Sequence, residues 1–320
     1  ILDLEVHQLD VMTAFLESDV DELIIMEQPE GYAVDGPDGE RMVCKLNKSL
    51  YGLKQAPRNW NRDIDKSLRD LGFEPSAVDI CIYVKNCGPG ELTIVVLYVD
   101  DMVVAASNMT LIDDFKTAMF KRYKTKDLGE LKFVLGMAME RDRVHRTMKL
   151  SQTGFVDQLL DRFGMADCKP LATPAVDVLP RIKATGKANT LYMQMVGAIL
   201  WIAMGTRPDV AYVAQALGRH MNASGDEHLK ACKRVLRYLK GTRELGIQYR
   251  GNFNQDVVMS VHADMNNKDK DVTISLYADA DWANDPSTRR STTGYVVMLA
   301  GGAVSWKSKL QQTVALSTSE

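Results

Sequence analysis

The sequence is short of cysteine, of long apolar runs and of charge of one sign, and each shortage excludes a class of protein. Its five cysteines are scattered along 320 residues without a CxxC pair. This argues against a structural zinc site or a disulfide framework and favours a reducing, intracellular compartment. The longest uninterrupted apolar run is "AILWIAM", residues 198–204, whereas a membrane span needs about 18 residues. No charged and then apolar leader opens the chain, so a secretory signal is not expected.

Charge and length narrow the class further. The formal net charge is −3, so binding of nucleic acid would have to rely on local clusters of positive charge. With 46% hydrophobic and 25% charged residues, the composition is ordinary for a globular protein. The length predicts about two domains, or three if one is small. The chain stops inside the polar run "STSE", and we expect it to be a fragment.

Helical and strand-like segments alternate in the first half of the chain. A helix is expected over residues 56–72, where apolar side chains recur at helical spacing between Pro57 and Gly72. Thr110 and Asp113 are spaced as a capping box for a second helix. Strands are expected around these helices, including two separated by the turn "DGPDG".

The second half has a different order. A short helix is expected over residues 153–163, and residues 169–190 contain three prolines that predict a linker. Helical segments are then expected to start near residues 190, 206 and 226, and antiparallel strands beyond residue 271. The whole pattern predicts an α+β fold with a sheet and helices, a helical connection and a second, smaller sheet.

Two adjacent aspartates, Asp100 and Asp101, lie in the apolar run "IVVLYVDDMVVAA", which is typical of a buried hairpin. A third, Asp10, is expected at the end of a short strand in "VHQLDVMTAFL". Three carboxylates delivered by separate strands supply the oxygen ligands that Mg²⁺ prefers. Two such ions can stabilise the attacking and leaving oxygens of a phosphoryl displacement. A solvated turn containing two aspartates is the alternative interpretation.

A series of motifs surrounds these aspartates. In chain order they are "HQLDVMTAFL", "MEQPEGY", "KLNKSLYGLKQAPRNW", "YVDD", "KDLGELKFVLGM", "LSQTGFVDQLLDRFGM", "RPDVAYVAQALGRHM", "HLKACKRVLRYLKGT", "ADADWANDPSTRRSTTGYVVMLAGGAVSWKSK" and "VALSTSE". Their order and spacing resemble the reverse transcriptase and ribonuclease H region of copia-type LTR retrotransposon polyproteins, over essentially the whole chain. The resemblance implies a palm-type antiparallel sheet with part of the fingers in residues 1–150. It implies a thumb- or connection-like helical region in residues 151–250 and a truncated ribonuclease H-like domain in residues 271–320.

The resemblance also implies roles for single residues. Asp10, Asp100 and Asp101 would be the catalytic ligands of two Mg²⁺ ions, with Mn²⁺ as a substitute, for attack of a primer 3′-hydroxyl on a deoxynucleoside triphosphate. Phe15 matches an aromatic gate against a ribose 2′-hydroxyl, and Tyr98 lies where the primer terminus is contacted. The other matches are Tyr51, Gly52 and Lys54 beside the incoming nucleotide and template, and Leu135 and Gly136 in the hairpin that grips the primer end.

A second acidic motif, "LYADADW", resembles the first strand of a ribonuclease H domain. Asp279 matches the first metal-binding carboxylate of that domain. Asp281 is the next candidate, and Asp264 in "SVHAD" is a weaker rival. Glu320 corresponds to the first of two glutamates of which the second is catalytic, so it receives no role. The ribonuclease H part is therefore expected to be incomplete and inactive.

Two groups of cations are candidates for phosphate contacts. One face of the helix expected from residue 226 carries Lys230, Lys233, Arg234, Arg237 and Lys240. The second group is Lys121, Arg122, Lys124 and Lys126. A solvated helix face is an equally good interpretation of the first group.

The predicted function is the RNA-directed DNA polymerase segment of a retrotransposon polyprotein. Its expected partners are an RNA/DNA template-primer, dNTP and the integrase-like, protease and capsid parts of the same polyprotein, with no membrane. The expected location is intracellular, in a cytoplasmic particle with a nuclear product. The alternative is an inactive retroelement remnant that at most binds nucleic acid. A Ca²⁺-binding structural protein is disfavoured because no EF-hand ligand ladder is present.

Overall fold

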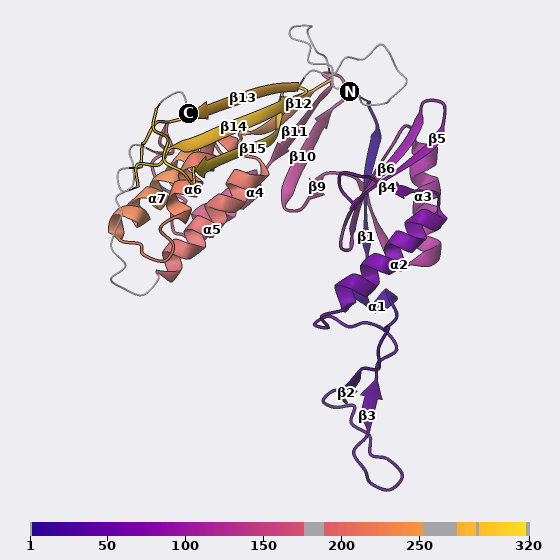
Figure 1. The fold of residues 1–320 in the computed structure, drawn as a ribbon. Helices are drawn as coiled ribbons and strands as arrows, with labels where there is room; N and C mark the ends of the chain where they lie inside the picture. Colours follow the sequence, from indigo (N-terminus) through magenta and orange to yellow (C-terminus); the bar gives the residue numbers. More distant parts are fainter. Residues whose placement is uncertain (1, 176–188, 252–273, 286–287, 318–320) are drawn as a thin grey trace. The chain divides into compact units, whose positions relative to one another are not determined.

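The computed structural model describes residues 2–175, 189–251, 274–285 and 288–317. The chain divides into two compact units, one from Leu2 to Leu131 and the other from Lys132 onward. Figure 1 shows the elements of each unit, coloured along the sequence. Within the described residues, no helix is long and apolar enough to cross a membrane.

A six-stranded antiparallel sheet is the framework of the first unit, with strand order β4-β5-β6-β7-β1-β8. Its strands are β1 (Glu5–Val11), β4 (Glu74–Pro75), β5 (Ile82–Gly88), β6 (Glu91–Tyr98), β7 (Asp101–Ala106) and β8 (Thr125–Glu130). β1 pairs with β7 on one side and with β8 on the other. Segments far apart in the sequence therefore become neighbours in the middle of the sheet.

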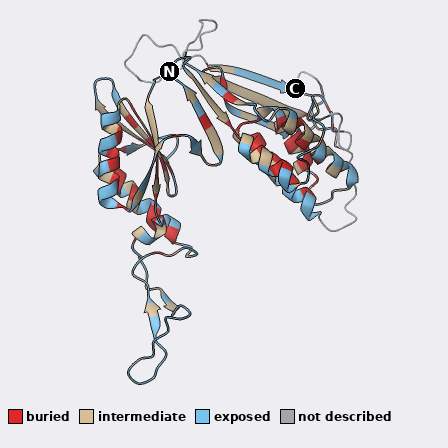
Figure 2. Ribbon diagram, turned by 180° about the vertical axis from the view of Figure 1, so that it is seen from behind, coloured by how far each residue is buried: buried red, intermediate tan, exposed pale blue. Residues whose placement is uncertain are grey.

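Two helices, α2 (Ala56–Asp70) and α3 (Met109–Arg122), pack against this sheet. The buried core between them and the strands includes Leu9, Val11, Trp60, Ile64, Leu68, Val95, Leu97, Met102, Val104, Ile112, Phe115 and Met119. Strand side chains alternate between the two faces of a sheet. The residues between these core positions, Asp10 and Asp101 among them, therefore point to the face opposite the helices. Both aspartates are half-buried, the intermediate class of Figure 2.

The predicted helix over residues 56–72 is confirmed as α2, with Pro57 in its first turn and Gly72 (φ 86°) after its end. The predicted capping box of α3 is wrong. Asn108 is the N-cap, and its side-chain oxygen accepts a hydrogen bond from the N–H of Leu111 at 3.1 Å. Asparagine caps helices at least as well as threonine, so helix α3 begins at Met109 and Thr110 lies inside its first turn.

A small outlying segment follows β1. It contains α1 (Ala14–Glu17) and a two-stranded sheet of β2 (Ile25–Glu27) and β3 (Val43–Lys45). The two strands lie apart from the six-stranded sheet in Figure 1. The predicted turn "DGPDG" lies between them, as expected.

The second unit begins with a four-stranded antiparallel sheet of order β12-β11-β10-β9. Its strands are β9 (Phe133–Val134), β10 (Met137–Asp142), β11 (Thr147–Ser151) and β12 (Gly246–Arg250). β12 follows all the helices in the sequence and pairs with β11. This pairing ties β10 and β11 to the later part of the chain, so the second unit begins at Lys132. The domains expected over residues 1–150, 151–250 and 271–320 stay a prediction.

Helices form the centre of the second unit and share one apolar core. They are α4 (Thr153–Arg162), α5 (Thr190–Gly205), the short 3-10 helix η1 (Pro208–Val210), α6 (Ala211–Gly218) and α7 (Asp226–Gly241). The predicted helix starts near residues 190 and 226 are confirmed, and the start expected near residue 206 falls at η1 and α6.

A three-stranded antiparallel sheet of β13 (Ile274–Ala280), β14 (Thr292–Leu299) and β15 (Gly302–Leu310) ends the described chain. Trp306 on β15 donates its indole N–H to the carbonyl of Ala203 on α5 at 2.7 Å. The N–H of Arg250 on β12 bonds the carbonyl of Ala300 at 2.7 Å. The predicted α+β class with antiparallel sheets is confirmed.

Candidate active site

Four side chains from four neighbouring strands form one row across the sheet of the first unit. Asp10 on β1 is directly opposite Asp101 on β7 and, on its other side, Lys126 on β8. Asp101 is in turn opposite Tyr98 on β6. Directly opposed residues of antiparallel strands point to the same face. Two carboxylates are therefore flanked by an ammonium group and a phenol.

A two-residue turn, Val99 and Asp100, connects β6 to β7 and places the third carboxylate beside this row. Val99 has a φ of 58°, a left-handed conformation that costs a non-glycine residue about 1–2 kcal/mol. Two outside groups hold the turn. The indole N–H of Trp60 bonds the Val99 carbonyl at 2.6 Å, and the N–H of Val11 bonds the Asp100 carbonyl at 2.9 Å.

The carboxylates repel one another. Burial, followed by the negative charges of Asp100 and Asp101, raises the pKa of Asp10, and the positive charge of Lys126 opposes that rise. Gln8 donates its side-chain amide to the Asp101 carboxylate at 3.0 Å. The row therefore carries an excess of negative charge that a cation would neutralise.

The donor set fits a hard divalent cation in its chemistry, since it consists of carboxylate oxygens on adjacent strands. Among the residues that the structure describes, no three His, Cys, Asp or Glu side chains are already arranged to hold a metal ion. Asp101 instead shares its carboxylate with Gln8. Coordination of an ion by all three aspartates would thus require their side chains to turn toward it.

Phe15 and Tyr51, both predicted to contact the nucleotide, lie against each other. Their ring centroids are 4.7 Å apart and the rings are tilted by 49°. Tyr51 is exposed, and Gly52 after it has a φ of 99°, which favours glycine in this turn. Lys54 is exposed in the same loop. The structure brings together an aromatic pair that the sequence alone left as separate residues.

Other predicted site residues lie in the second unit. Leu135 and Gly136 form the two-residue turn between β9 and β10, with φ angles of 49° and 76°. Both angles are positive, as in the turns typical of tight hairpins. The hairpin expected at these residues is therefore present.

The acids predicted for ribonuclease H lie at the end of β13. Asp281 accepts a hydrogen bond from the N–H of Thr292 at 2.7 Å, and Asp279 bonds the N–H of the next residue. A cavity of about 440 Å³, with Tyr212 of α6 and Trp306 of β15 in its wall, is lined by both aspartates. Asp264 lies outside the described residues, as does Glu320.

The cations of α7 are largely occupied by the polypeptide itself. Arg234 bonds the Thr173 hydroxyl at 2.8 Å, Arg237 bonds the Lys169 carbonyl at 2.7 Å, and Lys240 bonds the carbonyls of Ala166 and Cys168. Lys230 pairs with Glu227 at 2.8 Å, and Lys233 is exposed. Most of this face therefore ties α7 to the segment of residues 166–173.

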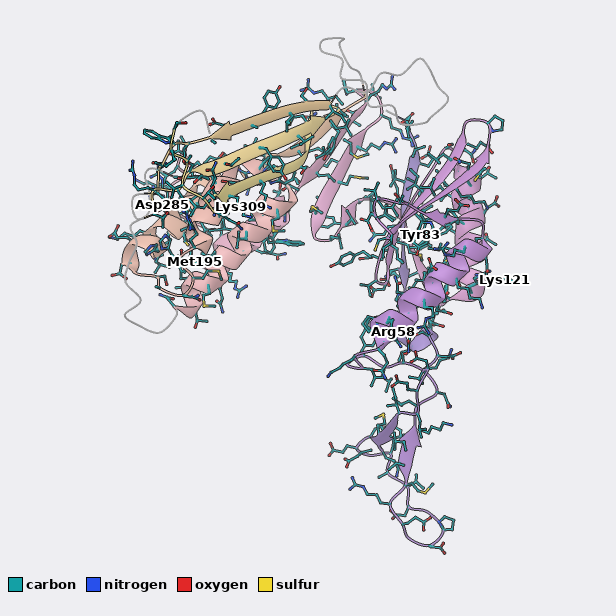
Figure 3. The ribbon with its side chains drawn as sticks, in the orientation of Figure 1. Arg58, Tyr83, Lys121, Met195, Asp285 and Lys309 are labelled. Carbon is teal, nitrogen blue, oxygen red and sulfur yellow. The ribbon has the colours of Figure 1, made fainter. Side chains whose placement is uncertain are left out.

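The cations at the end of α3 and in the segment after it differ in their surroundings. Lys121, labelled in Figure 3, and Lys124 are exposed. Arg122 bonds the carbonyl of Ser67 at 2.9 Å and so connects α3 to α2. Lys126, predicted only as a phosphate contact, is the direct neighbour of Asp10. The group thus separates into one structural cation, two surface cations and one cation of the candidate site.

Two residues of the candidate site were missed by the sequence reasoning. Gln8 precedes Asp10 by two residues, so the two-residue period of a strand could have placed it on the same face. Trp60 was expected in the core of α2, and nothing in the sequence indicates that its indole reaches the turn before Asp100. That contact depends on how the helix packs on the sheet.

Comparison with known proteins agrees with this geometry. A sequence model of the family described as reverse transcriptase (RNA-dependent DNA polymerase) matches residues 2–177. The chain belongs to the reverse transcriptase family. The match includes every strand of the six-stranded sheet, and hence Asp10, Asp100 and Asp101.

Relatives of this reverse transcriptase extend the likeness beyond residue 177. The retrovirus-related Pol polyprotein from transposon TNT 1-94 of Nicotiana tabacum is 40% identical over 100% of this chain and 23% of its own length. That from transposon RE1 of Arabidopsis thaliana is 36% identical over 98% of this chain and 20% of its own length. A putative transposon Ty5-1 protein of Saccharomyces cerevisiae is 32% identical, covering 94% of this chain and 92% of its own length.

The chain therefore spans about a fifth to a quarter of the two Pol polyproteins that it matches. The predicted resemblance to copia-type retrotransposon polyproteins is confirmed, and by ancestry the chain is an RNA-directed DNA polymerase.

Proposed function

We propose that this chain is a polymerase segment that transfers nucleotides to a primer 3′-hydroxyl with two Mg²⁺ ions, for which Mn²⁺ can substitute. The observation that carries the proposal is the direct opposition of Asp10 and Asp101 on the adjacent strands β1 and β7, with Asp100 in the turn before β7. Their mutual repulsion supports a role that requires negative charge. Nothing in the packing of the sheet needs three acids at this position.

Each residue of the row has a task in this proposal. Asp10, Asp100 and Asp101 hold the ions through their carboxylate oxygens. Bound Mg²⁺ supplies positive charge that stabilises the phosphoryl oxygens during the displacement. Lys126, opposite Asp10, limits the repulsion among the carboxylates before metal arrives. Tyr98, which is 58% exposed, offers a ring and a hydroxyl to the primer terminus.

The aromatic pair and the neighbouring loop are proposed to bind the nucleotide. Phe15 would exclude a ribose 2′-hydroxyl, and Tyr51 supports its ring from the side. Gly52 and Lys54 would lie along the nucleotide and template. In the second unit, the turn of Leu135 and Gly136 would grip the primer, and Asp279 would belong to a ribonuclease H-like site.

The wider setting is proposed from the relatives, whose printed names describe Pol polyproteins. The partners would be template-primer, dNTP and other parts of the same polyprotein. The location would be an intracellular particle.

Primer extension on an RNA template with Mg²⁺ or Mn²⁺ tests the function, on this chain and on one extended at both ends with the sequence that flanks it. Asp100→Asn should abolish incorporation. The matched control is Asp113→Asn with Asp114→Asn, an exposed pair of adjacent aspartates on α3, which should leave incorporation unchanged. Incorporation that survives Asp100→Asn would contradict the assignment. No incorporation by either wild-type chain, together with retained RNA binding, would favour the inactive remnant.

A further inference from the structure

The turn that carries Asp100 cannot hold its shape through local sequence alone. A two-residue hairpin turn with a positive φ at its first position usually has glycine, asparagine or aspartate there. Here that position is Val99, a β-branched residue with a φ of 58°. Such a conformation persists only where the surrounding structure fixes it. The source of that constraint must therefore lie outside the hairpin.

One constraint comes from helix α2. The indole N–H of Trp60 donates to the carbonyl of Val99 at 2.6 Å. This carbonyl belongs to the peptide that joins Val99 to Asp100, so the bond fixes the plane from which the Asp100 backbone begins. Indole has a single donor and no acceptor, so Trp60 can only donate this bond and the Val99 carbonyl must point toward it.

Trp60 is itself held rigidly. Its side chain is 2% exposed, and its ring meets that of Tyr123 edge to face with centroids 5.2 Å apart. The Tyr123 hydroxyl is anchored to α2 by Asp63 Oδ2 at 2.9 Å and Ser67 Oγ at 2.5 Å. The donor that reaches the turn is thus fixed by the core between α2, α3 and the sheet.

We propose that Trp60 is a positioning residue for the metal-binding aspartates. It acts through the Val99 carbonyl to keep Asp100 and Asp101 in place beside Asp10. This role rests on the proposed function, in which these carboxylates hold divalent cations. It needs no contact between Trp60 and metal, primer or nucleotide.

The test measures Mn²⁺ binding to the full chain by electron paramagnetic resonance, without any need for turnover. Trp60→Phe removes the N–H and keeps an apolar ring, and Tyr83→Phe is the matched control because it removes from the same core a hydroxyl that bonds Asp65 at 2.9 Å. Trp60→Phe should weaken Mn²⁺ binding about five- to tenfold, the effect of losing one buried hydrogen bond. Tyr83→Phe should bind Mn²⁺ like the wild type, although both variants unfold at lower temperature.

Asp100→Asn separates the two proposals. If Asp100→Asn loses Mn²⁺ binding and Trp60→Phe binds like the wild type, the positioning role is wrong and the metal assignment stands. If Asp100→Asn binds like the wild type, the metal assignment is wrong and the positioning role falls with it. Hydrogen exchange of residues 99–102 should also quicken in Trp60→Phe and not in Tyr83→Phe.

If Trp60→Phe does not fold, solvent exchange of the Trp60 indole N–H in the wild-type chain tests the proposal instead. The indole N–H signals are assigned by replacing Trp201, Trp282 and Trp306 one at a time. The Trp60 signal should exchange slowly with solvent, in contrast to Trp201 and Trp282, which are 45% and 53% exposed. Exchange of the Trp60 signal as fast as theirs would overturn the proposal.

Discussion

Asp10 and Asp101 are directly opposed on the adjacent strands β1 and β7, on the face of the sheet that the helices leave open. Burial raises the pKa of Asp10, and repulsion by the carboxylates of Asp100 and Asp101 raises it further. An arrangement that costs stability in the metal-free protein is expected where a cation is to bind.

Asp10→Asn should make the metal-free chain more stable at neutral pH. The folded-state pKa of Asp10 is raised, so its ionisation disfavours folding, and this penalty builds as the pH rises from the unfolded to the folded pKa. Below both values the carboxyl is protonated in both states and the penalty is absent. The gain from Asp10→Asn should therefore be seen at pH 7 and shrink toward pH 3, in urea unfolding with a chelator present. A variant less stable than the wild type at pH 7 would contradict it.

Tyr51→Ala should loosen the Phe15 ring. The two ring centroids are 4.7 Å apart, and such a pair contributes about 0.5–1.5 kcal/mol. The discrimination of dNTP against rNTP, measured as the ratio of kcat/KM values, should fall roughly two- to tenfold, and further in Phe15→Ala. Tyr51→Phe retains the ring and should keep the discrimination. Equal ratios for Tyr51→Ala and the wild type would show that the pair does not act as a gate.

Arg207→Ala should destabilise the second unit strongly. Arg207 is 2% exposed, pairs with Asp209 at 2.6 Å and bonds both the hydroxyl and the carbonyl of Thr242. Removing one partner of a buried pair costs about 3–5 kcal/mol. The control Arg243→Ala breaks an exposed pair with Asp157 and should cost less than about 1 kcal/mol. Equal losses in urea unfolding would contradict the buried role.

The same pair predicts a pH dependence. Burial alone would raise the pKa of Asp209, but hydrogen bonds from Arg207 and Tyr238 outweigh it and lower that pKa. A lowered folded-state pKa contributes stability above the unfolded pKa that is lost as the pH falls through the folded one. Arg207→Ala should therefore lose less stability than the wild type between pH 5 and pH 2. A parallel loss in both chains would exclude Asp209 as the source.

The cations of α7 should divide into two classes. Arg237 makes a solvent-exposed bond to the carbonyl of Lys169, so Arg237→Ala should lower the free energy of unfolding by about 0.5–1.5 kcal/mol. Lys233 is exposed, and Lys233→Ala should change stability by less than about 0.5 kcal/mol. If α7 contacts phosphates, Lys233→Ala should reduce the salt dependence of RNA binding by about one ion. Unchanged stability in Arg237→Ala would contradict a structural role for this side chain and would favour the alternative that this face of α7 is simply solvated.

Local features of the fold could be predicted from the sequence because they depend on neighbouring residues. The helical period of residues 56–72 and the apolar strands around Asp100 are of this kind. The cap of α3 was mistaken because Asn108 and Thr110 are both good caps, and local sequence does not choose between them. The division of the structure between residues 131 and 132 could not be predicted from the sequence, because the pairing of β12 with β11 is not local.

The candidate site shows the same division. The identity of the three aspartates came from the motifs, but their register across β1 and β7 required the structure. The Trp60 contact and the bonds of α7 to residues 166–173 join residues distant in sequence. No period or motif carries that information.

The central claim is that Asp10, Asp100 and Asp101 bind divalent cations. The most direct test is the binding of Mn²⁺ to the full chain, measured without substrate by electron paramagnetic resonance. The wild type should show saturable binding that is lost in Asp10→Asn, Asp100→Asn and Asp101→Asn. It should be retained when Asp113 and Asp114 on α3 are both replaced by asparagine. Equal binding by all of these variants would contradict a metal site built from Asp10, Asp100 and Asp101.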